Sequence, residues 1–382
     1  MRQSASRVDL DGVRDESAAV SKGPVRACAA VALLAIGFGC EGNGATTDSF
    51  LPGVTSKSAP EVLSRTRPLM STVFQIQVDS PPPNAENVIR QAFEEIERLE
   101  TVLSEWRDDS DVAKVNSLAG KKSVKVGSDT LRVVDAGMDV STWSRGAFDL
   151  SWAALWGLYD FRPDSIKIPT REEIKPRIAL VNYKNIRVSK KYQTVYLKKR
   201  GMAIGTGGIA KGYALDHAGA ILRGAGIDNY MIFGGGQVQV HGKRDGRPWR
   251  VGIQHPRDTG SYFAALESTG ASFSTSGDYE NAVFDGVGKR WHHIIDTTTG
   301  LPANKSLSVT IMTSEGIYAD ALSTAAFVLG PEKALKMLSR MAYPAEAVIV
   351  GVDCRVYMTP KAKKRIRMNV DLVDGRLPNC KP

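Results

Sequence analysis

Helical and strand patterns are intermixed along this chain, and this order limits the folds it can adopt. A strand-like alternation at 70–78 is followed at 84–106 by apolar residues at helical spacing. Three later strand patterns, at 249–254, 262–267 and 309–313, lie close enough in sequence to pair antiparallel. The chain is therefore predicted to adopt an α+β fold, with mixed or antiparallel sheets flanked by helices, rather than a doubly wound parallel sheet.

The composition is that of a globular protein. The 382 residues are 42% hydrophobic and 24% charged, enough for one large or two ordinary domains. The formal net charge of +9 favours anionic ligands, and much of it lies at 175–200 and 361–367. The first of these segments alternates apolar and basic residues, which predicts two strands with a solvated basic face. No nucleic-acid-binding pattern accompanies the charge, so no nucleic-acid partner is expected.

The N-terminal region predicts export. An apolar run at 27–39 is too short to span a bilayer, follows basic residues and ends directly before Cys40. Residues 1–40 are therefore interpreted as an export signal. Gly39 before Cys40 is similar to a bacterial lipobox, which would leave the protein lipid-anchored on the periplasmic or outer side of a bacterial membrane. A simple secretory signal, or a true start further downstream, is the alternative.

The segment after the signal separates it from the folded region. Residues 41–67 are rich in Ser, Thr, Gly and Pro, which predicts a flexible tether, and 68–382 is then a single folded domain. Cleavage of the signal would remove Cys28, and Cys40 would carry the lipid. The other two cysteines of the chain are Cys354 and Cys380. They could form a disulfide in an oxidising compartment, and no His or Cys at metal-binding spacing supports a zinc site.

A glycine-rich turn, GTGGIAKG at 205–212, leads into a further helical pattern. Backbone amides freed by glycine, a helix N-terminus and Lys211 together suit a phosphate group. The turn is not a Walker A loop, because Ala210 precedes the lysine and Gly212 follows it. A tight strand-to-helix turn explains the same residues about as well.

The segment ADALST at 319–324 combines a carboxylate with hydroxyls. If it lies in a helix, Asp320 and Thr324 project from one face, as two ligands of a hard cation would. Capping of a helix start is the common alternative. In the segment WHHIID, alternation along a strand would let only one of His292 and His293 face a site.

These segments occur in a recognisable order. The chain carries GAFDLSWAALWGLYDF, GGIAKGYALDHAGAIL, FGGGQVQVHG with PWRVGIQHP, STSGDYEN, HHIIDTTTGLPA and ADALSTAAFVLG. In sequence and spacing this series resembles the ApbE family of flavin transferases, from about Met70 to about Met341. The resemblance implies an ApbE-like fold. It also implies an enzyme that uses Mg²⁺ and FAD to attach FMN, through a phosphoester, to a Thr or Ser of a partner protein, with release of AMP.

The same resemblance implies roles for individual residues. Lys211 would steady the pyrophosphate of FAD, and either His293 or Asp320 would accept the proton of the incoming hydroxyl. No cage of carboxylates is required, because Mg²⁺ commonly shares its oxygen ligands between protein and phosphates. Contacts to FAD are implied for Met70, Trp106, Ala147, Phe148, Asp149, Lys211 and Ile295. Metal ligands are implied at Asp320, Thr324 and the carbonyl of Gly208, with Ser323 at a further metal-associated position.

Three positions depart from the usual family pattern. Gly205 stands where an acidic residue is frequent, Trp106 where tyrosine is frequent and Thr297 where proline is frequent. Stacking on flavin or adenine would survive the tryptophan. The segment STGAS at 268–272 resembles the acceptor motif that such transferases modify, but its place before TSGDYEN favours a strand and turn of the enzyme itself.

Two other functions share part of this evidence. A protein that binds FAD without catalysis would be expected to lose the metal ligands, whereas Asp320 and Thr324 are both present. An enzyme that hydrolyses FAD to FMN and AMP would use every residue named above. The transferase is the favoured function, with an exported flavoprotein as its acceptor.

Overall fold

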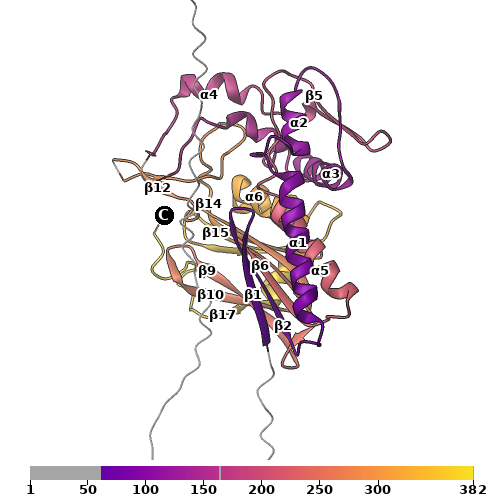
Figure 1. Cartoon of the computed structure of the whole chain (residues 1–382). Coiled ribbons are helices and arrows are strands. Elements are labelled where there is room, and N and C mark those ends of the chain that lie inside the picture. Colours follow the sequence, from indigo (N-terminus) through magenta and orange to yellow (C-terminus); the bar gives the residue numbers. More distant parts are fainter. Residues whose placement is uncertain (1–61, 163–164, 287, 382) are drawn as a thin grey trace, which may run out of the picture.

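An eight-stranded antiparallel sheet forms the centre of the molecule (Figure 1). The computed structural model describes residues 62–162, 165–286 and 288–381. Neighbouring strands follow the order β1-β2-β6-β7-β11-β14-β15-β16. Their bounds are β1 Val62–Leu69, β2 Thr72–Asp79, β6 Tyr230–Gly234, β7 Gln237–His241, β11 Gly270–Gly277, β14 Ser306–Thr313, β15 Glu346–Gly351 and β16 Val356–Met358.

Three smaller sheets complete the β structure. One has the strand order β17-β10-β9-β8, a second pairs β12 with β13, and the third has the order β3-β5-β4. Every strand pairing in the described part of the chain is antiparallel. Their bounds are β3 Val124–Lys125, β4 Ile186–Ser189, β5 Thr194–Leu197, β8 Lys243–Arg244, β9 Arg247–His255, β10 Asp258–Ser268, β12 Val283–Phe284, β13 Arg290–Trp291 and β17 Arg367–Met368.

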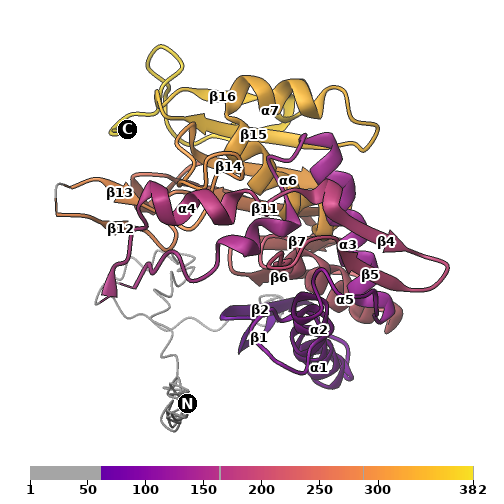
Figure 2. The ribbon, with the colours of Figure 1, turned by 90° about the horizontal axis from the view of Figure 1, so that it is seen from above.

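Helices α1, α5 and α6 cover one face of the large sheet. Figure 2 shows α1 beside β1 and β2, and α6 beside β11 and β14, where the two elements pack. This arrangement confirms the predicted α+β class with helices flanking antiparallel sheets. The helices are α1 Ala85–Leu103, α2 Asp111–Ser117, α3 Ser128–Trp143, α4 Arg171–Ile178, α5 Ala210–Gly224, α6 Gly316–Leu329, α7 Pro331–Leu338 and α8 Pro360–Arg365, with 3-10 helices η1 Leu150–Leu155 and η3 Tyr183–Asn185.

The apolar stripe predicted at 84–106 becomes the buried face of α1. Val88, Phe93, Ile96 and Leu99 are all buried in the main core. Burial of each large apolar side chain contributes about 1.5–3 kcal/mol, so this stripe fixes the helix against its neighbours. Helix α6 is different, because it is apolar on nearly every side and is packed between α5, α3, β11 and β14. A helix with that pattern belongs in the interior.

A second core lies between the large sheet and the four-stranded sheet. Trp249, Phe263 and Phe273 are fully buried there. Cys354 joins this core, and its disulfide to Cys380 spans a Cα–Cα distance of 5.9 Å. The disulfide considered possible from the sequence is therefore present in the structure. It links the C-terminal tail to the second core. Among the described residues, none of the helices has both the length and the hydrophobicity that a membrane span requires.

The structure corrects three sequence predictions. Strand β1 begins at Val62, inside the segment predicted as a tether, because it pairs with β2 along its whole length. The basic segment contains the two predicted strands, β4 and β5, but its first residues lie in helix α4, where Thr170 and Glu173 form a capping box at the N-terminus. The strand at 309–313 belongs to β14 and pairs with β11 and β15, whereas β9 and β10 pair with each other.

Residues 1–61 lie outside the described residues. The predicted export signal, the lipidated cysteine and most of the tether fall in that segment. They stay predictions.

Candidate functional site

The glycine turn and helix α6 meet, as the sequence predicts. The backbone amide of Gly212 donates to Asp320 Oδ2 at 2.9 Å. The Thr324 hydroxyl lies 3.5 Å from the position that a β-carbon on Gly208 would occupy. A carboxylate, a hydroxyl and the turn that carries the Gly208 carbonyl therefore share one small region, although they are more than a hundred residues apart in sequence.

Asp320 is a buried carboxylate with unused acceptor capacity. Only 3% of the residue is exposed, and burial raises its pKa, while the charge of Lys211 acts in the opposite direction. Its two oxygens accept from the Gly212 amide and from Gln237 Nε2 at 3.0 Å. Because an ionised carboxylate offers about four acceptor positions, further lone pairs remain. The Thr324 side chain makes no hydrogen bond to the described residues, so its oxygen is also available.

This donor set fits a hard cation that shares its ligands with a phosphate. Within the described residues, no group of three or more His, Cys, Asp or Glu side chains could hold a metal ion. A cation at Asp320 would therefore depend on carbonyl and hydroxyl oxygens and on its substrate, which is the usual arrangement for Mg²⁺. Gln237 Oε1 is buried and has no partner in the described part of the chain, so another oxygen acceptor lies on a side chain that binds Asp320.

Gln237 is a site residue that the sequence predictions missed. Its amide nitrogen donates to Asp320 Oδ1 at 3.0 Å and to Ser274 Oγ at 3.3 Å. Three glycines directly precede it, which is typical of a turn or of close packing, but no spacing within this segment indicates which residue Gln237 contacts. Ser323 has a different environment, because its buried hydroxyl bonds to Ser274 Oγ, Ser276 Oγ and the Asp320 carbonyl. That hydroxyl holds α6 to β11.

The glycine turn is shaped by a carboxylate from the loop after α1. Glu105 Oε2 accepts from the amides of Thr206 and Gly207. Its surroundings raise its pKa through burial, while these amide bonds lower it. Lys211 Nζ donates to the Gly207 carbonyl at 2.8 Å, so the lysine lies against the same turn. Sequence reasoning did not single out Glu105.

Gly205 is required by a neighbouring tryptophan. A β-carbon at this position would lie 2.9 Å from Trp152 Nε1, which is closer than real side chains approach. A side chain at this position would therefore clash with Trp152. The carboxylate that bonds this turn comes from Glu105.

An aromatic pair lies next to the turn. Trp106 directly follows Glu105, is 74% exposed and stacks on Trp156 with ring centroids 4.9 Å apart. Phe148 packs close to the turn, because its ring lies 3.3 Å from the position of a Gly208 β-carbon. These rings could bound a planar ligand.

The other residues predicted to contact FAD have contacts within the fold. The buried carboxylate of Asp149 accepts from the Ser151 amide and hydroxyl and from the Tyr183 amide, and burial raises its pKa. Ala147 is buried beside Phe148. Met70 lies at the tip of the β1–β2 hairpin, and Ile295 packs in a small core with Leu155. Their contacts to FAD stay predictions.

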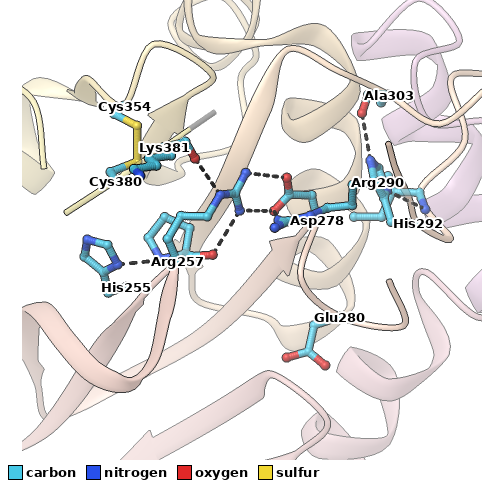
Figure 3. Close-up of polar contacts among 12 residues, drawn as sticks. His255, Arg257, Asp278, Glu280, Arg290, His292, Ala303, Cys354, Cys380 and Lys381 are labelled. Atoms are coloured by element: carbon cyan, nitrogen blue, oxygen red, sulfur yellow. Dashed lines mark hydrogen bonds and ion pairs between the residues drawn. A yellow bond between two sulfur atoms is a disulfide. The ribbon is translucent and has the colours of Figure 1, made fainter. Parts of the chain in front are cut away.

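The two adjacent histidines have separate roles. They lie in an irregular segment rather than in the expected strand. As the alternation predicted, their side chains still have different surroundings, because His292 is buried and His293 is exposed. His292 is buried, bonds through Nε2 to the Ala303 carbonyl at 2.9 Å and accepts from the Ile294 amide through Nδ1 (Figure 3). Both of its ring nitrogens are therefore used. This makes His292 a structural residue.

His293 keeps one ring nitrogen free. Its Nδ1 lies 3.0 Å from the Glu280 carbonyl, and because a carbonyl can only accept, Nδ1 carries the proton and Nε2 keeps its lone pair. Although part of the residue is exposed, desolvation by the surrounding protein lowers the pKa of His293 to about 4, and the charge of Lys211 acts in the same direction, whereas the bond to the Glu280 carbonyl acts against them. His293 is therefore a neutral base beside Lys211.

The segment that carries Glu280 is anchored by an ion-pair cluster. Arg257 binds both carboxylate oxygens of Asp278, at 2.7 and 2.8 Å, and Arg290 binds one of them at 3.2 Å. Figure 3 shows this cluster beside the disulfide, with Arg257 also donating to the Lys381 carbonyl. The C-terminal tail and the TSGDYEN segment are thereby joined through one guanidinium.

The acceptor-like segment STGAS is part of the scaffold. Ser268 ends β10, Gly270 begins β11, and the buried Ser272 accepts from Gln239 Nε2 at 3.1 Å. The strand-and-turn interpretation is confirmed.

Replacement of Gly212 by alanine should lower the free energy of unfolding by about 3 kcal/mol. A β-carbon there would lie 2.0 Å from the Gly316 carbonyl oxygen, so α5 and α6 would have to separate. Chemical denaturation of the purified protein measures the change. Gly224→Ala is the matched control, because nothing lies within 4 Å of its β-carbon position. Equal stability of the two variants would contradict the close helix contact.

Comparisons with known proteins show which family this chain resembles. The ApbE family model matches residues 70–349. The FAD:protein FMN transferase of Vibrio cholerae is 31% identical to this chain over 295 residues, covering 75% of this chain and 87% of the relative. The FAD:protein FMN transferase of Treponema pallidum is 31% identical over 329 residues, covering 81% and 88%.

Solved structures show the same fold. The crystal structure of the ApbE protein of Thermotoga maritima has a TM-score of 0.73 at 30% identity, covering 80% of this chain and 100% of that one. The flavin transferase ApbE of Vibrio cholerae has a TM-score of 0.71 at 27% identity, covering 80% and 99%. With a family model that spans most of its length and relatives of this similarity, the chain belongs to the ApbE family.

Proposed function

We propose that this chain is a Mg²⁺-dependent FAD:protein FMN transferase that moves FMN to a Thr or Ser hydroxyl of an exported partner protein and releases AMP. The observation that carries the proposal is the buried carboxylate of Asp320, held against the glycine turn by the Gly212 amide. Lys211 binds the same glycine turn, the exposed Trp106 directly follows the Glu105 that bonds this turn, and the charge of Lys211 acts on His293. The relatives named above are FAD:protein FMN transferases.

Asp320, Thr324 and the Gly208 carbonyl would hold the cation. When bound, Mg²⁺ neutralises charge that develops on the diphosphate. Lys211 would bind the same diphosphate after leaving the Gly207 carbonyl, and the Thr206 and Gly207 amides belong to the same turn. Trp106 would stack on one of the planar rings of FAD.

His293 would accept the proton of the incoming hydroxyl at Nε2. The hydroxyl oxygen forms a bond to the phosphorus on the FMN side, and the bond from that phosphorus to the bridging oxygen breaks. AMP leaves with the bridging oxygen, and FMN remains on the acceptor as a phosphoester. Because the Glu280 carbonyl fixes the Nδ1 proton, the ring presents its lone pair without needing to flip.

The reaction can be tested with the purified protein, FAD, MgCl₂ and a fraction of exported proteins. A covalent FMN adduct on a Thr or Ser of one of those proteins, found by mass spectrometry together with AMP, is expected. AMP and free FMN without an adduct would instead identify an FAD pyrophosphatase. Retention of intact FAD in the presence of Mg²⁺ and acceptor would identify a binding protein. A matched reaction with EDTA tests the dependence on metal.

We also propose that the protein is exported and held at a membrane through a lipid on Cys40. The disulfide between Cys354 and Cys380 supports an oxidising compartment, where such bonds persist. No nucleic acid is proposed as a partner.

Replacement of Cys40 by serine should move the protein from the membrane fraction to the soluble exported fraction, because the acyl chains are the proposed anchor. Fractionation followed by immunodetection measures the distribution, and Cys28→Ser, inside the proposed signal, is the control. A Cys40→Ser protein that stays with membranes would contradict the lipid anchor.

A further inference from the structure

Helix α6 is capped by a residue of another helix. Glu315 occupies its N-cap position but makes no capping hydrogen bond with its side chain. The first two amides of the helix, those of Gly316 and Ile317, instead donate to the two carboxylate oxygens of Asp216 on α5, at 2.6 and 2.9 Å. A carboxylate at this end also interacts favourably with the helix dipole.

Asp216 and Asp320 form matching contacts one helical turn apart. Asp216 lies four residues after Gly212 on α5, and Asp320 lies four residues after Gly316 on α6. Asp216 accepts from the Gly316 amide, and Asp320 accepts from the Gly212 amide. Because neither glycine has a side chain, the two backbones can approach closely enough for both bonds. Two such contacts fix both the rotation and the sliding of α6 along α5.

Strand β7 supports both carboxylates from the same face. Gln237 and Gln239 are two residues apart, so their side chains point to one side of the strand. Gln237 donates to Asp320 at 3.0 Å, and Gln239 donates to Asp216 at 3.0 Å. The carboxylate at the proposed metal site and the capping carboxylate are therefore held by equivalent donors of one strand.

We infer that Asp216 is a positioning residue, which sets α6 on α5 so that Asp320 and Thr324 present their oxygens together with the Gly208 carbonyl. This inference rests on the proposed function. Burial raises the pKa of Asp216 to about 6, although its bonds to the two helix amides lower it.

Asp216→Asn should raise the metal concentration needed for half-maximal activity by about tenfold, because an amide cannot accept from both helix amides. Saturating metal should restore most of the rate. A loss of folded protein alone would lower the rate at every metal concentration without moving the half-maximal point. Glu315→Gln is the matched control, because it removes a charge at the same helix end from a side chain that does not cap.

A second measurement does not depend on turnover. In the presence of FAD, free Mn²⁺ is followed by electron paramagnetic resonance while Mn²⁺ is added to wild type, Asp216→Asn and Glu315→Gln. Weaker Mn²⁺ binding in Asp216→Asn alone is expected. If the asparagine variant fails to fold, Gln239→Met removes one donor to Asp216 and should give a smaller shift in the same direction, about fivefold.

The outcomes separate the two proposals. Wild type that binds no Mn²⁺ with FAD would overturn both the metal-dependent function and this inference. Wild-type affinity in Asp216→Asn, or in Gln239→Met if that variant is the one that folds, would overturn the positioning role alone. The metal-dependent function would then stand.

Discussion

Asp320→Asn is expected to lower the rate of AMP release from FAD by about a thousandfold or more. The substitution keeps the size of the side chain but removes the charge that faces the cation. It also places an amide group against either the Gly212 amide or the Gln237 amide, which now donate to the carboxylate. The rate is measured by chromatography of AMP over a range of Mg²⁺ concentrations.

The fold should survive this change. Burial raises the pKa of Asp320, so the charged form is disfavoured by its surroundings, and its removal relieves that cost. The donor–donor contact of the new amide opposes this relief, so the thermal unfolding midpoint of Asp320→Asn without ligand should stay close to that of wild type. Glu332→Gln, an exposed carboxylate on α7, is the control for a charge change elsewhere. A wild-type rate in Asp320→Asn would remove the metal assignment from α6.

His293→Asn should lower transfer to the acceptor by a factor of about 10²–10⁴, the usual contribution of a general base. FAD and Mn²⁺ should still bind, because the side chains proposed to hold them are untouched. Single-turnover formation of the FMN adduct measures the effect, with His241→Gln as a control on a histidine at the end of β7. Unchanged transfer in His293→Asn would assign the proton acceptor to another group.

The pH dependence follows from the lowered pKa of His293. Since that pKa is about 4, the ring stays neutral from pH 8 down to about pH 5, and the wild-type rate should show no loss from its protonation in that range. The sign for stability is opposite to that of a paired histidine. The unfolded chain takes up the proton at higher pH than the folded chain, so this group lowers stability as the pH falls from about 6.5 towards 4.

Local patterns predicted the elements of the site well. Helical spacing placed Asp320 and Thr324 on one face, and the structure puts that face beside the glycine turn. The resemblance to a known family supplied the pairing of these two segments, which no spacing within either segment indicates. Alternation along the chain also predicted correctly that His292 and His293 point to different sides, although the segment is not a regular strand.

Residues that act through distant contacts were missed. Glu105, Asp216 and Gln237 each reach the site or its supporting helix across roughly eighty to a hundred residues of sequence. Their positions depend on how helices and strands pack, and a single sequence carries no direct record of that packing. The two strands predicted in the basic segment are present, and only the helix at its start was missed, for a simpler reason. Its helix is initiated upstream by Thr170 and Glu173, outside the alternating stretch that predicted strands.

The place of the C-terminal tail in the second core has a consequence for how the chain matures. Leu377 and Cys354 are buried in that core, and β17 at Arg367–Met368 completes the sheet next to β10. A ribosome or a translocation channel that still holds the segment from β17 to Leu377 would delay closure of that half of the molecule. We therefore expect β9 and β10 to stay open to chaperones until this segment has emerged, whereas α1 and the strands around it can associate earlier.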